Sequence, residues 1–251
     1  AASGLARIRR PSSRPSSLDL ARRLRRANEV AATAFVVGGS LFAIGAALAQ
    51  AGVDATACAS VYLVGGVFFS TGGYTSVLQV ANEPSGERVS AEATWHWWSH
   101  EPRRLQWLSA VVLFAGTLVF AINLIDSFIE ELSPSAADRL VWSPDIVGCA
   151  LFLVSGHLAM VGIGGGWRFW RGRDLGWWII AVNQLGSVLF MVSAVVSFVR
   201  PSSGEPVATG IANWGTLTGA LCFAIAGLMQ EFEHPLGPRR RRVSAEAQAS
   251  A

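Results

Sequence analysis

One segment of this chain carries residue types that bind divalent metal ions. If positions 92–100 form a helix, Glu92, His96 and His100 fall on one face at i, i+4 and i+8. One carboxylate and two imidazoles at that spacing are compatible with zinc or another divalent ion. Three tryptophans are interleaved with the histidines: Trp95, Trp97 and Trp98. Because tryptophan gathers at membrane–water interfaces, the sequence favours an interfacial anchor here and leaves the metal site as the alternative.

A second set of reactive groups is scattered through apolar stretches. Its members are Asn123, Asp126, Asp145, His157 and Asn183. Polar groups inside a bilayer are costly and often mark pathways or proton relays. The two aspartates lie near the ends of their stretches, where we expect them to be hydrated. His157 lies nearer the middle, where a hydrogen bond to a neighbouring helix or a relay would suit it.

Catalytic chemistry is not indicated by the sequence. The three cysteines, Cys58, Cys149 and Cys222, are far apart, and no nucleophile, base and orienting acid can be assembled at one depth. The glycine run at 162–166 is not followed by Lys-Ser or Lys-Thr, so it is not a phosphate-binding loop. We therefore expect no enzymatic activity and no bound cofactor.

Composition and segment length indicate which elements must position these residues. Hydrophobic residues make up 51% of the chain and charged residues 15%. Six apolar stretches stand out: 30–50, 60–80, 106–125, 145–165, 177–199 and 211–230. Each has about 20 residues, the length with which a helix crosses the hydrocarbon layer. Since lipid offers backbone groups no hydrogen-bond partner, these stretches are predicted to be transmembrane helices.

A glycine followed four residues later by phenylalanine recurs in every stretch. A small residue usually follows four residues after that, so one helix face carries a notch, a knob and often a second notch. The predicted packing residues are Gly38, Phe42, Gly65, Phe69, Gly73, Gly116, Phe120, Gly148, Phe152, Gly156, Gly186, Phe190, Gly219, Phe223 and Gly227. Because two versions of the signature alternate, we predict an all-α polytopic membrane protein of six transmembrane helices, arranged as three parallel-repeat helical hairpins.

Basic residues are distributed unevenly between the two sides of the predicted spans. All 20 are arginine, and all but Arg139 and Arg200 lie before the first span, in the second or fourth loop, or in the C-terminal tail. The positive-inside rule therefore predicts a cell-membrane protein with both termini in the cytoplasm. An even number of spans leads to the same conclusion, because it places the two termini on one side.

The predicted organisation follows from these spans and their charges. A basic tail, disordered or at the interface, occupies 1–28, and a basic disordered tail occupies 231–251. Hairpins at 30–82, 106–165 and 177–230 are separated by cytoplasmic loops at 83–105 and 166–176. Leu20, Leu24 and Ala27 suggest a short helix lying on the inner leaflet. Membrane lipid, including anionic lipid at the arginine-rich face, is the expected partner, nucleic acid is not, and a protein partner or homo-oligomer stays open.

The first hairpin resembles a known family. Gly39-Ser40-Leu41-Phe42-Ala43-Ile44-Gly45, Tyr62-Leu63-Val64-Gly65-Gly66, and Gln79 before Asn82 are similar to the YrhK-like domain, a two-span bacterial membrane family. The resemblance covers 30–82, and the rest of the chain is similar to longer membrane proteins that carry this domain. It implies membrane location and the pairing of the two spans, and it implies no activity and no catalytic residue.

Two functional hypotheses follow from the sequence. In the first, the chain is a non-enzymatic structural or accessory bundle held by glycine and phenylalanine packing. In the second, it is a small transporter or channel in which Asp126, Asp145, His157 and Asn183 line a polar path. The first is favoured because few charged groups lie in the middle of the spans.

Overall fold

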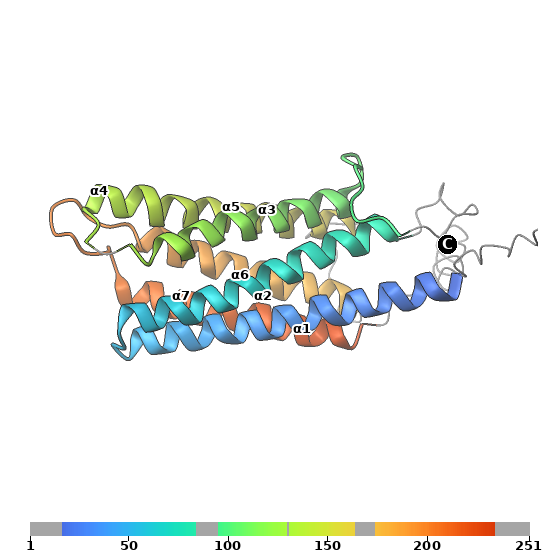
Figure 1. The fold of residues 1–251 in the computed structure, drawn as a ribbon, viewed down its shortest axis with the longest axis horizontal. Coiled ribbons are helices and arrows are strands. Elements are labelled where there is room, and N and C mark those ends of the chain that lie inside the picture. The colour runs from blue at the N-terminus through green and yellow to red at the C-terminus, as the bar shows by residue number, and fades with distance from the viewer. Residues whose placement is uncertain (1–16, 84–94, 130, 164–173, 234–251) are drawn as a thin grey trace, which may run out of the picture.

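The computed structural model describes residues 17–83, 95–129, 131–163 and 174–233, and it is an array of long helices (Figure 1). Glu92, most of the loop at 166–176, the first 16 residues and the tail from 234 onward lie outside the described residues. What was predicted for those segments stays a prediction.

Helices account for nearly all the regular structure in the described ranges, which confirms the all-α prediction. In chain order they are α1 (Ser17–Gln50), α2 (Ala55–Asn82), α3 (Leu105–Asp126), α4 (Pro134–Ala137), the π-helical turn η1 (Asp138–Trp142), α5 (Ser143–Gly162), α6 (Leu175–Val196) and α7 (Thr209–Glu231). Six helical rods are long and apolar enough to cross a membrane, with α4, η1 and α5 forming one of them. The chain is therefore a multi-pass membrane protein.

The first helix is longer than predicted. It has 34 residues, which corresponds to about 50 Å, whereas the hydrocarbon layer is about 30 Å thick. Leu20, Leu24 and Ala27 therefore belong to the first turns of α1, and the separate surface helix predicted for them is wrong. Arg25 pairs with Glu29 at 2.9 Å along the same helix, which stabilises this extension slightly.

The fourth rod begins 11 residues earlier than predicted, at Pro134 instead of Asp145. The apolar stretch at 145–165 does not include the first turns of this rod, in which Pro144 lies well after the start. Ser133 caps it, its side chain accepting a hydrogen bond from the backbone N–H of Ala136 at 3.3 Å. The wider π turn just before Pro144 accommodates the proline, and the Ser143 hydroxyl donates to the Asp138 carbonyl at 2.7 Å. Asp145 consequently lies well inside the rod.

The rods form a closed ring. Each packs against the next in the chain, and α7 packs against α1. At this last seam Gly39 approaches the backbone of α7 closely, because a Cβ added there would lie 2.8 Å from the Ala220 carbonyl oxygen. Figure 1 shows the rods running side by side along the long axis. We call the end at which α1 begins and α7 ends the tail end, and the opposite end the far end.

The outward faces of the rods carry apolar side chains. Examples from different helices are Val67, Leu118, Val154, Val188 and Ile225, which are 43–61% exposed. In water such a surface would drive aggregation, whereas in a bilayer it meets lipid. The exposed valine, isoleucine and leucine side chains agree with the membrane assignment.

The signature glycines and phenylalanines interlock within three pairs of rods, which are α1 with α2, α3 with α5, and α6 with α7. A Cβ added to Gly38 would lie 2.9 Å from the Phe69 ring, and one added to Gly65 would lie 3.2 Å from the Phe42 ring. The same exchange recurs in the other two pairs: Gly116 with Phe152, Gly148 with Phe120, Gly186 with Phe223, and Gly219 with Phe190. Each helix thus gives its partner a notch and receives a ring.

The small residue that is third in the signature contacts a different helix from the glycine and the phenylalanine. On α2, α5 and α7 it faces the neighbouring pair rather than its own partner. An added Cβ on Gly73 would contact Phe114 of α3, one on Gly156 would contact Gln184 of α6, and one on Gly227 would contact Ala32 and Val36 of α1. On α3 the equivalent position holds Leu124, whose side chain occupies the space beside Gly66.

Filling one of these notches should destabilise the bundle. In Gly186→Ala the new methyl group would lie 2.9 Å from the Gly219 carbonyl oxygen, so the backbones must separate. We expect a loss of about 1–3 kcal/mol in the free energy of unfolding, measured by detergent titration in mixed micelles. The control is Gly210→Ala on α7, where the added atom has nothing within 4 Å. An equal loss in both variants would contradict the interlock.

Candidate functional site

Six phenylalanines, one from each rod, meet in the middle of the bundle. Phe42, Phe120 and Phe190 form one triangle, with ring centroids 5.6–6.3 Å apart. Phe69, Phe152 and Phe223 form a second, with centroids 5.1–6.3 Å apart. We call the two triangles together the phenylalanine prism.

The prism is closed by contacts between its triangles. Phe42 meets Phe69 at 5.7 Å, Phe120 meets Phe152 at 6.0 Å, and Phe190 meets Phe223 at 5.2 Å. Each of these contacts lies within one sequential pair of rods. Five of the six side chains are 2–4% exposed, and Phe120 is partly buried against them. Aromatic rings therefore fill the centre of the bundle, where a solute path would have to run.

One helical turn from the prism toward the far end, each pair of rods carries a second set of facing residues. In α1 and α2 an added Cβ on Gly45 would lie 2.8 Å from the Tyr62 ring. In α6 and α7 the hydroxyls of Ser193 and Thr216 lie 2.8 Å apart. Both sets follow from the interlock, since residues three after the phenylalanine and three before the facing glycine belong to the same faces.

The same register places Asn123 opposite Asp145 in the remaining pair. Asn123 follows Phe120 by three residues, and Asp145 precedes Gly148 by three. An added Cβ on Gly148 would lie 3.2 Å from the Phe120 Cβ, which fixes how α3 faces α5. Of the three facing sets, this one contains an ionisable carboxyl group.

Asp145 does not lie near the end of its span, so that prediction is wrong. The rod begins at Pro134 and not at Asp145. Asp145 precedes Gly148 by three residues, or about 5 Å along the helix axis. The Cys149 thiol donates a hydrogen bond to Asp145 Oδ1 at 3.6 Å. Asp145 shares a helix face with the buried Gly148, Cys149 and Phe152, so its partly exposed side chain faces the interior of the bundle.

Asn123 and Asp126, the other two polar residues between the prism and the far end, lie close to where they were expected. Asn123 is 8% exposed, and its carbonyl oxygen accepts a hydrogen bond from the Ser127 hydroxyl at 2.8 Å. Asp126 is the last residue of α3 and is partly buried. Together with Asp145 they form the far-half group of polar residues.

His157 and Asn183 lie on the other side of the prism. His157 is exposed and follows Gly148 by nine residues, or about 13 Å, so it lies near the tail end and not near the middle of the span as predicted. Asn183 is partly buried on the tail side of Gly186, and its carbonyl oxygen accepts from the Ser187 hydroxyl at 3.0 Å. The structure therefore does not bring the five predicted polar residues together.

Several polar contacts between helices were not predicted from the sequence. Ser109 and Ser155 exchange hydroxyl-to-carbonyl hydrogen bonds of 2.9 Å between α3 and α5. Gln184 of α6 is 7% exposed and fills the notch at Gly156, where its Nε2 donates to the Leu153 carbonyl at 3.3 Å. These residues could have been found by their constant offsets from the signature glycines.

A polar node joins three helices near the tail end. The amide groups of Gln79 on α2 and Gln230 on α7 each donate to Asn28 Oδ1 on α1 at 3.1 Å. Asn28 in turn donates to the Gln230 carbonyl at 3.1 Å. In the next pair of rods, Gln106 lies ten residues before its signature glycine, as Asn28 does, and donates to the Gly162 carbonyl at 3.2 Å.

The histidine-containing segment is not helical over 95–100, so the helical spacing on which the metal prediction rests is absent there. Asn82 fixes the segment: its amide donates to the His96 carbonyl at 2.7 Å, and its Oδ1 accepts from the His96 N–H at 2.8 Å. The His100 ring packs on Trp107 at 5.5 Å. Among the described residues, three candidate metal ligands do not come together.

The tryptophans of this segment are arranged as an interfacial anchor would be. Trp97 and Trp98 are 68% and 50% exposed, and the Trp97 carbonyl accepts from the Tyr74 hydroxyl at 3.3 Å. Arg104 holds the segment beside the end of α2, donating to the Val80 carbonyl at 2.8 Å and pairing with Glu83 at 2.7 Å. Two large aromatic side chains are thereby presented outward from a fixed backbone.

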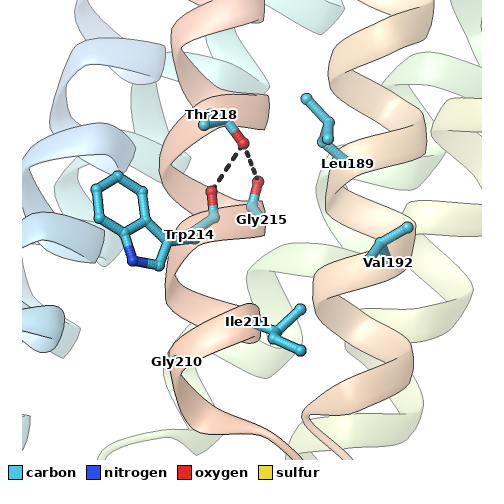
Figure 2. Close-up of a pocket in the computed structure, with 7 residues that line it drawn as sticks. All are labelled: Leu189, Val192, Gly210, Ile211, Trp214, Gly215 and Thr218. Carbon is cyan, nitrogen blue, oxygen red and sulfur yellow. Dashed lines mark hydrogen bonds between the residues drawn. The ribbon is translucent and has the colours of Figure 1, made fainter.

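A shallow groove of about 450 Å³ lies between α6 and α7 toward the far end, and Figure 2 shows its lining. The residues are Leu189, Val192, Gly210, Ile211, Trp214, Gly215 and Thr218. The Thr218 hydroxyl donates to the Trp214 carbonyl at 2.7 Å, so it is already bonded to its own helix (Figure 2). Ile211 and Trp214 are each 56% exposed, which places the groove on the outward, lipid-facing surface.

Comparison with known proteins does not add a family to this geometry. No protein-family model, curated protein or solved structure matches the chain. The resemblance of 30–82 to the YrhK-like domain therefore stays a prediction. What can be said of function rests on the contacts described above.

Removing a ring from the prism should be costly, and removing its sequence neighbour should not. Phe69 has four aromatic partners, whereas the adjacent Phe68 is 38% exposed. Because the unfolded helices stay in lipid, Phe69→Ala loses packing rather than transfer free energy, and we expect about 1–3 kcal/mol. Phe68→Ala should change the stability by less than about 0.5 kcal/mol. Detergent unfolding of both variants, compared with the unsubstituted protein, measures the difference.

Proposed function

We propose that this six-span membrane protein has a structural or accessory role, without enzymatic activity. The observation that carries the proposal is the phenylalanine prism. Nine ring contacts link one side chain from every rod, so the interior is devoted to packing at the depth where a carrier would hold its substrate. The outward surface and the loops then remain to meet lipid or another protein.

The same contacts support three parallel hairpins related by an approximate threefold axis along the membrane normal. One triangle of the prism comes from α1, α3 and α6, and the other from α2, α5 and α7. Within each hairpin the glycine-to-ring exchange joins equivalent positions. Because every hairpin enters and leaves at the same end, the repeats are parallel rather than inverted.

The placement of the arginines supports a cytoplasmic location for the tail end. Arg22, Arg23, Arg25, Arg26, Arg103 and Arg104 lie at that end, whereas Arg139 and Arg200 lie at the far end. Arg23 lies 6.0 Å from the centre of the Trp95 ring, so a cation and an interfacial aromatic side chain meet at this end. We propose that this face contacts anionic lipid of the inner leaflet.

The alternative function is a small transporter or channel. Asp145 inside a span favours it, because carboxyl groups at such depth often bind ions. Against it, the far-half polar residues are separated from His157 and Asn183 by the prism, and His157 faces outward. A continuous polar path would require the six rings to move apart.

Thiol labelling tests whether the centre of the bundle is closed. Ser187 is 3% exposed beside Gly186, so Ser187→Cys reports on the level of the prism. With Cys58, Cys149 and Cys222 replaced by Ala, we expect no reaction with a membrane-impermeant maleimide from either side until the protein is unfolded. Ser202→Cys in the far-end loop and Ala21→Cys on α1, both exposed, are the controls.

The controls also test the orientation, because Ser202→Cys should react from outside intact cells and Ala21→Cys only after permeabilisation. Reaction of Ser187→Cys in the folded protein would favour the transport alternative. Reversed labelling of the two controls would contradict the proposed orientation.

A further inference from the structure

Asp145 is the feature that a purely structural role leaves without an explanation. Its equivalents in the other two pairs of rods, Tyr62 and Thr216, are neutral side chains that a helix interface accommodates readily. A carboxyl group about 5 Å from the central glycine level is different, since charge at such depth is expensive and is usually functional. Figure 1 shows α5 beside α3, against which it packs.

No basic side chain compensates Asp145 from the elements that surround it. Among the described residues, α5 packs against α3, η1 and α6. Their basic groups, with those of α5 itself, are Arg139 and His157, which are about 9 Å and 18 Å away along the axis. The other titratable groups on these elements and across the core are Asp126, Asp138, Cys149 and Tyr62, none of which carries positive charge.

A weak donor on its own helix and an amide side chain in the facing register accompany Asp145. Cys149 is 1% exposed and donates to Asp145 Oδ1. Asn123 lies opposite in the register of the α3 and α5 interface, and its Oδ1 is 3.4 Å from the Ser127 hydroxyl. Carboxylate and amide oxygens are ligands that small hard cations prefer.

We propose that Asp145, with Asn123 across the α3 and α5 interface, binds a monovalent cation, either a proton or an alkali-metal ion. The cation reaches the site from the far end. The exposed part of Asp145 faces the interior of the bundle, and the prism closes the tail side. The site goes beyond a structural role and is compatible with a closed centre, because exchange with one side of the membrane needs no path across it.

Modification by dicyclohexylcarbodiimide tests the proposal on the full-length protein. This apolar reagent enters the bilayer and reacts with a carboxyl group only while that group is protonated, and peptide mass spectrometry locates the adduct. We expect modification of Asp145, and a rate that falls at least tenfold either as the pH rises or on adding sodium at constant pH. A fall with pH alone identifies the proton, and a fall with sodium but not with choline identifies an alkali-metal ion.

Matched variants separate the site from general stability. Asn123→Ala should raise the sodium concentration that halves the modification rate at least threefold, or, if the proton is the ligand, shift the pH dependence of the rate. Ser193→Ala, the equivalent position in α6, should leave both unchanged. Asp145→Asn should lose the adduct while keeping the same unfolding profile in detergent. The proposal is overturned if folded protein is not modified at Asp145 while unfolded protein is, or if the rate depends on neither pH nor sodium.

Discussion

Helices that already lie in lipid gain nothing from burying apolar surface against each other, so they must associate through close packing. In this bundle each helix of a pair has a glycine against which the phenylalanine ring of the other helix packs. Gly65 accommodates the Phe42 ring, and Gly38 accommodates the Phe69 ring. Three such pairs of contacts bring six rings together in the middle of the bundle, and the other contacts are arranged around them. The prism therefore links the local fit of two helices to the closure of the whole ring.

The exchange also determines what lies above and below it. Once a phenylalanine faces a glycine on an antiparallel neighbour, the residues one turn away on the two helices must face each other as well. The three pairs of rods use these places differently: Gly45 accommodates Tyr62, Ser193 bonds Thr216, and Asp145 occupies the register position opposite Asn123. Packing at the centre is repeated, and the chemistry one turn away is not. This division explains how a repetitive scaffold can contain a single ionisable group in its interior.

Much of the architecture could be predicted from the sequence because length and hydropathy directly encode helices that cross a bilayer. The positions of the glycines and phenylalanines could also be read, since they recur at fixed spacing. The start of the fourth rod could not, because Pro144 usually marks a helix boundary and nothing local signals that a π turn will accommodate it. Because of that one error, Asp145 was predicted to lie near the end of its span, whereas it lies inside the rod.

Other errors have similar physical causes. The depth of His157 depends on where its rod begins, so it was misplaced together with Asp145. The alternative of a metal site at Glu92, His96 and His100 assumed a helix, whereas Asn82 fixes His96 in a segment that is not helical. Contacts between helices of different pairs, such as that of Gln184 with Gly156, require the order of the rods around the ring, which hydropathy does not give.

A double-mutant cycle on Phe69 and Phe223 tests the central claim most directly. These rings come from α2 and α7, belong to different pairs of rods, and lie 5.1 Å apart. If the prism couples the pairs, the two alanine substitutions should be non-additive by about 0.5–1.5 kcal/mol in detergent unfolding. Phe69 and the exposed Phe128 form the control cycle and should be additive. Additivity of Phe69 and Phe223 within about 0.3 kcal/mol would contradict a bundle held together through its phenylalanines.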